Sequence, residues 1–397
     1  MPHPAVLLFY LAAFFQGIPH GVIPPLLPPL SSGLHLSLAE VGLVPAVFAL
    51  TRLLSDLPAG LLAGRLGTFR LMLIGMGLGC LGNAVAALAP NFTTLLAGRA
   101  VAGAGHGPVA ISNILALTAA FPSSQRGRAM SLLEVTSLGG FILVSPIAGL
   151  LAERIGWRAA LFLAAASSFG SLAAGILSGR AGFFDRVGRE ETALQTAGVP
   201  PAPAQPPVPV LWRAIVALDL VAFAHAFSWA GILNTAMPLH ADRSLGMTPK
   251  TIGSVVSLCL LTDITLQLAA GRLGDRIGRH RLIGPVLGLQ IAGSLLISFS
   301  AGPALLWLGA VVLGLGYTGW MTPAALLGDL TSGARRGRAL SWYRFCLDLG
   351  AVASPAILGV LLDRIGFGGA GILTAAVIAL AWTVNARWGV GGRQTDL

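Results

Sequence analysis

Charged side chains are scarce in this sequence. They make up only 10% of its 397 residues, whereas soluble domains average about 25%, so the composition excludes an ordinary soluble enzyme. Cysteine is scarce too: the chain has only Cys80, Cys259 and Cys346, and all three lie inside apolar runs. Such residues offer no disulfide framework and are interpreted as small core residues.

Lysine is almost absent. Lys250 is the only lysine among 25 basic residues, and the formal net charge is +10. A basic chain can bind nucleic acid, but these arginines are scattered between apolar runs, so we expect no nucleic-acid partner. The sequence also lacks a Walker-type phosphate loop and a Cys/His cluster with metal-ligand spacing. We therefore expect no ATP-driven export, no metal and no other cofactor.

Hydrophobic residues, by contrast, are abundant. They make up 55% of the chain, and the mean hydropathy is +0.81. A helix that crosses a bilayer needs roughly 20 apolar residues, and in lipid every backbone polar group must be satisfied within the protein. Twelve such segments predict an all-α, polytopic membrane protein. They span residues 5–28, 39–63, 69–89, 93–118, 127–153, 158–180, 210–237, 249–274, 280–300, 303–328, 337–362 and 367–388.

One long polar connection divides these segments into six and six. Residues 181–209 combine charged side chains with a Pro/Ala run, a composition typical of a linker without a fold of its own. We expect an N-terminal bundle over residues 1–180 and a C-terminal bundle over residues 210–397. Seventeen basic residues fall on the side of the termini, five on the other side and three inside helices. The positive-inside rule therefore predicts that both termini and the linker are cytoplasmic.

The two halves repeat each other. Residues 126–131 (Arg-Gly-Arg-Ala-Met-Ser) match residues 336–341 (Arg-Gly-Arg-Ala-Leu-Ser), and residues 153–156 match residues 363–366. Two homologous six-helix halves imply a pseudo-two-fold axis along the membrane normal. This organisation is typical of transporters that alternate access to a site near the membrane midplane between their halves.

A family resemblance covers essentially the whole chain. Residues 271–281 read Gly-Arg-Leu-Gly-Asp-Arg-Ile-Gly-Arg-His-Arg, which resembles the signature loop between the second and third helices of a half in the major facilitator superfamily. Residues 60–70 are a degraded copy of this loop, with Gly64 where the family has aspartate. Residues 139–149 resemble the fifth-helix motif of the drug/proton antiporters, although Ser145 stands where glycine is usual.

The resemblance implies that the signature loop takes part in gating. We expect Asp275 to face the positive N-terminal end of a neighbouring helix and the flanking arginines to meet lipid phosphates and acidic partners. Such contacts favour one conformation of a two-state protein; alternatively, the arginines only set the membrane topology. The residues assigned to this gate are Gly271, Asp275, Arg276, Gly278 and Arg279.

Four charged residues inside the membrane predict a second gate. Arg52 and Asp56 are spaced i,i+4 on the second segment, and so are Arg344 and Asp348 on the eleventh, which puts each pair on one helix face. In the family these two helices meet across the halves. We therefore expect reciprocal pairs, Asp56 with Arg344 and Arg52 with Asp348. Two intrahelical pairs without a gating role are the alternative.

Acidic residues inside predicted membrane segments are candidates to carry a coupled proton. Glu134 lies on the fifth segment and Asp263 on the eighth, and these helices form the other interface between the halves in the family. Carboxylates that share a buried site do not ionise together, so one of them holds a proton. Asp219 is a third candidate, because the seventh helix lines the family's cavity. Local hydrogen bonding or an inner water pocket is the alternative for each.

Polar residues on four segments predict a substrate cavity. Arg99, His106 and Asn113 recur every seven residues and keep to one helix face apart from a drift of about 20° per heptad. In the family the first, fourth, seventh and tenth helices line the cavity, so the resemblance adds Gln16, His20, His225, Asn234, Tyr317 and Trp320. A lone intramembrane histidine more often serves packing. The set as a whole predicts a mainly apolar cavity with a few polar anchors.

These expectations combine into one hypothesis for function. We expect a secondary active transporter, and no enzyme, that works as a monomer in a bacterial inner membrane. It would couple protons to the efflux of small amphipathic or hydrophobic molecules, and proton binding would shift the population of its two states. A proton symporter or facilitator for uptake is the alternative, and a receptor that transports nothing is a remote one.

Overall fold

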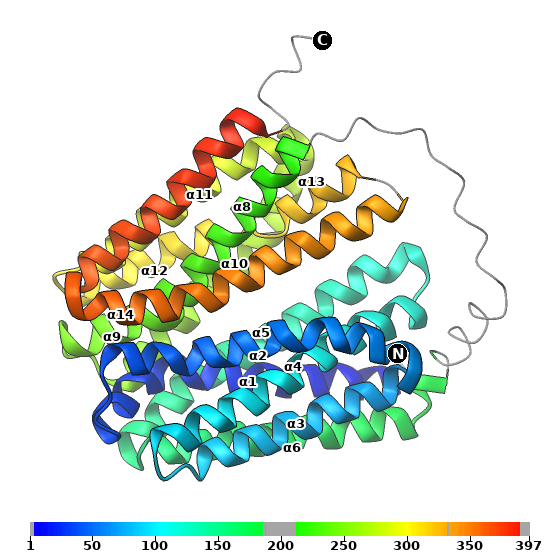
Figure 1. The fold of residues 1–397 in the computed structure, drawn as a ribbon, viewed down its shortest axis with the longest axis horizontal. Coiled ribbons are helices and arrows are strands. Elements are labelled where there is room, and N and C mark those ends of the chain that lie inside the picture. The colour runs from blue at the N-terminus through cyan, green and yellow to red at the C-terminus, as the bar shows by residue number, and fades with distance from the viewer. Residues whose placement is uncertain (1–3, 186, 188–211, 332, 390–397) are drawn as a thin grey trace. The chain divides into compact units, whose positions relative to one another are not determined.

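The computed structural model describes residues 4–185, 187, 212–331 and 333–389 (Figure 1). Within these residues every regular element is helical, as the composition predicts. The chain forms two compact units. Unit 1 comprises Met1–His35, Val47–Pro200 and Pro249–Gly253, and unit 2 comprises Leu36–Ala46, Pro201–Thr248 and Ser254–Leu397.

The first six helices follow one another with short connections. They are α1 (Pro4–Gly33), α2 (Leu38–Leu66), α3 (Thr68–Ala87), α4 (Phe92–Ala120), α5 (Ser123–Arg154) and α6 (Trp157–Arg180). Within unit 1, α1 packs against α5 and α6, and α3 packs against α4 and α6. This arrangement buries a core between helices that are separated in the sequence.

In the second half of the chain, some of the membrane-crossing segments are divided into shorter helical elements. The elements of this half are α8 (Trp212–Ser228), η1 (Trp229–Ala236), α9 (Met237–Arg243), α10 (Pro249–Ile277), α11 (Arg279–Ser298), α12 (Pro303–Tyr317), α13 (Thr322–Leu330) and α14 (Gly333–Trp388). Within unit 2, α8 packs against α14, and α11 packs against α12 and α14. These pairings correspond to those of α1 with α5 and of α3 with α4 and α6.

Eleven helices among the described residues are long and apolar enough to cross a membrane. The last of them, Arg335–Trp388, has 54 residues and would measure about 80 Å if straight, far more than the roughly 30 Å of a bilayer core. Gly366 breaks it with φ 65° and ψ −176°. The break separates the eleventh and twelfth predicted segments, so the predicted fold is confirmed.

A π-helical turn interrupts the seventh crossing between α8 and α9. Within η1, Asn234 Nδ2 donates to the Trp229 carbonyl oxygen at 2.8 Å, and Thr235 Oγ1 donates to the Ala230 carbonyl oxygen at 2.8 Å. Both bonds reach back five residues and so satisfy carbonyls along the widened turn. Wide turns of this kind are rare and occur often at functional sites.

Glycines at equivalent turns of the two halves share an unusual backbone conformation. Gly67 and Gly278 precede the third helix of their halves with φ 78° and 96°, and Gly156 and Gly366 precede the sixth with φ 116° and 65°. Positive φ strains residues that have a Cβ atom. The repeated glycines at these four turns are therefore explained by backbone geometry.

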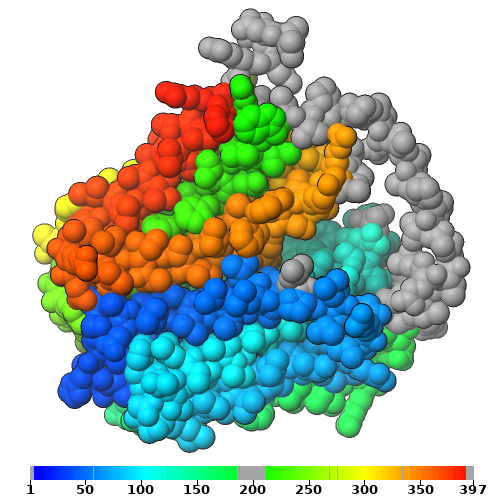
Figure 2. Space-filling view, viewed as in Figure 1, coloured from blue at the N-terminus to red at the C-terminus, as the bar shows by residue number. Residues whose placement is uncertain are grey.

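The outer faces of the helices carry large apolar side chains. Leu54, Phe162 and Leu380 are 65%, 48% and 60% exposed, and Figure 2 draws the surface to which these helices contribute. Exposed apolar side chains in such numbers would be a liability in water. They suit a surface that contacts lipid chains.

Close helix contacts in each unit depend on glycine. A Cβ atom added to Gly75 of α3 would lie 2.6 Å from the Gly105 carbonyl oxygen of α4, and one added to Gly293 of α11 would lie 2.6 Å from the Leu313 nitrogen of α12. Small residues let membrane helices approach closely, where van der Waals packing replaces the hydrophobic effect as the driving force.

We predict that Gly82→Ala lowers the apparent Tm of the purified protein. Its new Cβ would lie 2.6 Å from the Gly98 carbonyl oxygen and 2.7 Å from Ala102 Cα, so α3 and α4 would have to move apart, at a cost of about 1–3 kcal/mol. Gly77→Ala on the same helix is the control, since nothing lies within 4 Å of its Cβ position. Equal melting temperatures for the two variants would contradict this account of the packing.

Candidate functional site

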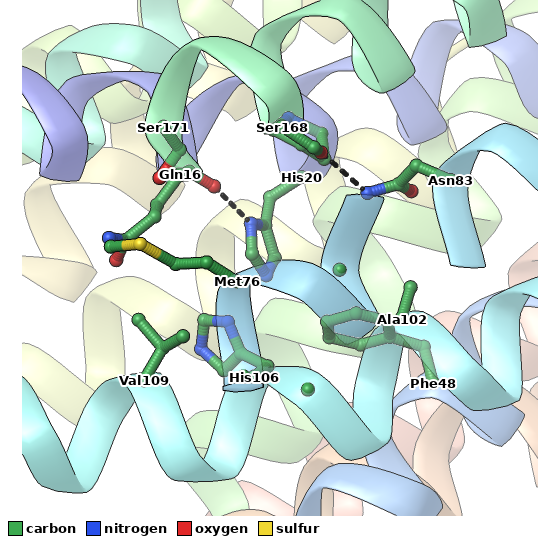
Figure 3. Close-up of a pocket in the computed structure, with 14 residues that line it drawn as sticks. Gln16, His20, Phe48, Met76, Asn83, Ala102, His106, Val109, Ser168 and Ser171 are labelled. Atoms are coloured by element: carbon green, nitrogen blue, oxygen red, sulfur yellow. Dashed lines mark hydrogen bonds between the residues drawn. The ribbon is translucent and has the colours of Figure 1, made fainter. Parts of the chain in front are cut away.

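A cavity in unit 1 gathers several of the polar residues predicted from the sequence. Gln16 and His20 of α1 and His106 of α4 line it together with Phe48 of α2 (Figure 3). Its volume is about 50 Å³, which is room for a few water molecules or a small polar group. Most of the remaining lining is apolar or glycine.

His20 presents a hydrogen-bond acceptor to this cavity. Its Nδ1 lies 3.0 Å from the main-chain oxygen of Gln16 (Figure 3). Because a carbonyl only accepts, Nδ1 carries the hydrogen, and Nε2 of the neutral ring has a free lone pair. Nε2 is buried and has no hydrogen-bond partner among the described residues. The ring centroid lies 4.8 Å from that of His106 and 5.2 Å from that of Phe48.

Gln16 adds a donor beside this acceptor. Asn113 Nδ2 of α4 donates to Gln16 Oε1 at 3.1 Å, and this bond orients the Gln16 amide. Gln16 Nε2 is then left buried, with no partner among the residues that the structure describes. His20 Nε2 and Gln16 Nε2 are therefore an unpaired acceptor and an unpaired donor on two residues that line the cavity.

Arg99 is buried behind this cavity rather than lining it. Its side chain is only 4% exposed, and its Cζ lies 4.5 Å from the Phe48 ring centroid. Arg99 Nη1 donates to Asn83 Oδ1 at 3.5 Å, and Asn83 Nδ2 donates to Ser168 Oγ at 2.9 Å. A cation–π contact and a charge-assisted bond thus stabilise a charge that would be costly at membrane depth.

Unit 2 holds a related cluster around His225 of α8. Gln290 Nε2 of α11 donates to His225 Nδ1 at 3.1 Å and to the Gly316 carbonyl oxygen at 2.9 Å. Neutral His225 therefore carries its hydrogen on Nε2, the opposite tautomer to His20. The Tyr317 ring lies edge-on at 5.0 Å and the Trp320 ring stacks at 6.2 Å. The cavity here measures only about 10 Å³.

The remaining predicted cavity residues have structural partners. Tyr317 is 1% exposed, and its hydroxyl lies 3.2 Å from Ser228 Oγ. Asn234 belongs to η1, where its amide donates to the Trp229 carbonyl oxygen. Neither residue lines the cavity of unit 1 or that around His225. Their assignment to a substrate cavity stays a prediction.

None of the three acidic coupling candidates is among the residues that line the unit 1 cavity. Asp263 is 7% exposed, whereas Glu134 and Asp219 are half-buried. Asp219 Oδ1 is buried without a hydrogen-bond partner among the described residues. Glu134 belongs to unit 1 and Asp263 to unit 2. The predicted joint proton site of these two carboxylates stays a prediction.

Two of the four charged residues predicted to form the second gate lie on the eleventh crossing and contact each other. Arg344 Nε lies 3.1 Å from Asp348 Oδ2, which is the intrahelical arrangement left open by the i,i+4 spacing. In unit 1, a Cβ atom on Gly107 of α4 would lie 2.7 Å from Asp56 Oδ1, so the Asp56 carboxylate packs against α4. The reciprocal pairs across the halves, which also involve Arg52, stay a prediction.

A flanking arginine of the signature loop meets an acidic partner, as the motif implies, although the motif did not predict which residue this partner is. Arg279 Nη1 lies 3.2 Å from Asp329 Oδ2 at the end of α13. Gly278 supplies the turn with positive φ, a Cβ on Gly271 would meet nothing within 4 Å, and Arg276 is exposed. The side chain of Asp275, on which the motif centres, lies outside the described part of the chain.

Sequence reasoning missed Asn83, Gln290, Phe48 and Asp329. Asn83 and Gln290 each carry the only side-chain amide of their helix, and a polar side chain at membrane depth is a functional candidate by default. Applying that rule to amides as well as to charges would have found both. Phe48 carries no such signal, because nothing distinguishes it from the other aromatic residues of membrane helices.

Comparison with known proteins gives matches to a family model, to curated relatives and to solved structures. The family model of the Major Facilitator Superfamily matches residues 9–230 and 218–392. Multidrug resistance protein 2 of Bacillus subtilis is 24% identical over 90% of this chain and 88% of its own length. Quinolone resistance protein NorA of Staphylococcus aureus is 30% identical over 37% of this chain and 38% of its own. A mutant of the peptide transporter POT has the same fold, with a TM-score of 0.77 and 16% identity over 97% of this chain and 94% of its own.

We predict that Gly79→Gln blocks transport while the protein stays folded. Gly79 lines the unit 1 cavity, and nothing lies within 4 Å of its Cβ position, so the new side chain would enter the free space. Initial transport rates, measured as accumulation of a fluorescent substrate by intact cells, should fall at least about tenfold, the equivalent of 1.4 kcal/mol. Gly77→Gln, which also has open space but does not line the cavity, should be active. An active Gly79→Gln variant would remove this cavity from the transport pathway.

Proposed function

Because this chain belongs to the Major Facilitator Superfamily, we propose that it exports small amphipathic or hydrophobic molecules by alternating access, driven by a proton gradient. It is a multi-pass membrane transporter of small molecules embedded in a bilayer. The finer proposal concerns the direction, the energy source and the class of substrate.

The unit 1 cavity is the observation that carries this proposal. Phe48, Met76 and Val109 give it an apolar surface, and Gln16 Nε2 and His20 Nε2 on its lining residues have no hydrogen-bond partner among the described residues. Sugars require many hydrogen bonds, whereas this lining suits an apolar body with one polar group. The relatives named for drug resistance, one of them similar over 90% of this chain, support export.

A proton gradient is the energy source that fits this chain. We assign the proton to Glu134, Asp219 or Asp263, since each places a carboxylate within a membrane-crossing helix. Proton binding to one facing state would shift the population towards it, and substrate would be released by its lower affinity for the other state. The proposal requires no metal, no other cofactor and no enzymatic step.

The proposed setting is the bacterial inner membrane, with both termini cytoplasmic. The excess of arginine on the side of the termini supports this orientation. We propose a monomer, since alternating access between two halves needs only one chain.

The decisive experiment is compound accumulation in cells. A host without its own efflux pumps would express the full chain, and a panel of fluorescent and toxic compounds would be tested with and without a protonophore. We expect cells that express the chain to accumulate less of the amphipathic compounds than control cells. The protonophore should abolish this difference, because export would lose its driving force. Higher accumulation would establish uptake and overturn the export proposal.

The variant Glu134→Gln tests whether Glu134 carries the coupled proton. The amide keeps the shape of the carboxylate but releases no proton, so proton-driven efflux should be lost while exchange of substrate down its own gradient continues. Efflux that keeps the pH dependence of the original protein would remove Glu134 from the coupling residues and leave Asp219 and Asp263.

We further propose that Asp56 and Arg344 form a pair that closes the cytoplasmic side. Charge reversal at either residue should reduce the transport rate at least about fivefold, the effect of about 1 kcal/mol, because like charges would then oppose each other. The double variant Asp56→Arg with Arg344→Asp should recover much of the rate. The reversal of Arg52 together with Asp348 tests the second pair in the same way, and absence of rescue in both would favour the intrahelical Arg344–Asp348 bridge over the reciprocal pairs.

A further inference from the structure

A hollow of about 260 Å³ lies at one end of unit 2, where α11 begins and α14 ends. His280 and Arg281 from the first turn of α11 and Asn385 near the end of α14 give it polar sides. Leu218 and Leu326 give it an apolar floor. This combination fits a ligand with a charged group and an apolar body.

The charge of the hollow is positive. Arg281 is exposed and makes no ion pair among the described residues. No acidic side chain of the described part of the chain lines the hollow. The arginine two residues earlier, Arg279, is instead engaged by Asp329 at 3.2 Å. The hollow therefore presents a cation without a counter-ion from its own lining.

Tryptophans place this end of unit 2 at the membrane–water boundary. Trp212 begins α8 and Trp388 ends α14, and their rings lie 5.9 Å apart. Arg213 Cζ lies 5.7 Å from the Trp212 ring, and Trp382 lines the hollow itself. Tryptophan is enriched at the level of lipid headgroups, so headgroups are the molecules nearest to this hollow.

The internal repeat provides a comparison within the same molecule. Residues 67–70 of unit 1 correspond to residues 278–281 of unit 2, which places Phe69 where unit 2 has His280. The Phe69 ring lies 4.7 Å from that of Phe184, and its Cε2 would lie 2.5 Å from a Cβ on Gly179 of α6. Aromatic side chains thus fill the corresponding place in unit 1.

Unit 2 cannot form the same aromatic plug. His280 is smaller and more polar than phenylalanine, and Phe183 and Phe184, which close the cluster of unit 1, have no aromatic counterpart after Trp388 in the sequence. The hollow of unit 2 therefore carries basic groups where the corresponding place in unit 1 is filled by aromatic side chains.

We propose that this hollow binds the phosphate headgroup of an anionic phospholipid. Arg281 and His280 would donate to the phosphate oxygens, Asn385 would hydrogen-bond the polar part of the headgroup, and the apolar floor would contact the start of the acyl chains. Basic pockets between membrane helices are suited to anionic headgroups. The site does not depend on the direction of transport or on the coupling ion.

The test uses the full chain purified in a non-ionic detergent. Dioleoyl phosphatidylglycerol, dioleoyl phosphatidylcholine and inorganic phosphate would each be titrated, with native mass spectrometry to count bound lipid and thermal unfolding to follow stabilisation. We expect phosphatidylglycerol to bind and raise Tm more than phosphatidylcholine. Arg281→Gln should weaken its binding about fivefold, which corresponds to about 1 kcal/mol for one basic residue near the membrane surface.

Two further variants make the test specific. Arg70→Gln is the matched control, because Arg70 is also exposed and holds the corresponding place in unit 1; its effect should stay below twofold. His280→Phe restores the unit 1 residue, so it should fill the hollow and displace lipid while Arg281 is kept. Equal effects of Arg281→Gln and Arg70→Gln would overturn the site. Stabilisation by inorganic phosphate equal to that by phosphatidylglycerol would overturn the lipid and identify a site for free phosphate.

Discussion

The absence of water around the membrane-crossing segments is the constraint on which the rest of this structure depends. Without water, every backbone donor and acceptor must pair within its own segment, and only the helix achieves this for a single crossing. The same absence removes most of the hydrophobic drive for helices to associate. Close contacts such as that of Gly75 with Gly105 therefore carry much of the packing, and one methyl group at such a contact is enough to separate two helices.

The constraint also governs the polar side chains. A polar atom at membrane depth must find a partner or line a space that polar ligands reach. Asn83 illustrates the first outcome, since it bonds both Ser168 and Arg99. His20 Nε2 and Gln16 Nε2 illustrate the second, since both are buried without a partner among the described residues and both residues line the same cavity. The unsatisfied atoms thus mark the place where a ligand would contribute most.

The sequence predicted what depends on composition and period, and it missed what depends on rotamer and partner. Run lengths of apolar residues are dictated by bilayer thickness, so the fold followed from them directly. The break at Gly366 could also be predicted from the sequence, because this glycine repeats Gly156 of the first half. The spacing of Arg344 and Asp348 fitted an intrahelical pair and a reciprocal pair equally well, because i,i+4 places side chains on one face without choosing the partner. Asp329 was missed because a residue at a helix end gains its partner from another helix, which spacing along one helix does not reveal.

The repeat shows how two units with equivalent backbones can place different polar groups at the same position. A Cβ atom added to Gly105 would lie 2.8 Å from the Gly79 nitrogen, and one added to Gly316 would lie 2.7 Å from the Gln290 nitrogen. Gly79 and Gln290 therefore hold equivalent places in their units. Glycine leaves a cavity of about 50 Å³ in unit 1, whereas the Gln290 side chain occupies that place in unit 2, bonds His225, and leaves about 10 Å³. The residue after each glycine, His106 or Tyr317, directs its ring at an imidazole of the first helix of its half. A single position of the repeat therefore decides whether the histidine of that half is bonded by a glutamine, as His225 is, or keeps a ring nitrogen without a partner among the described residues, as His20 does.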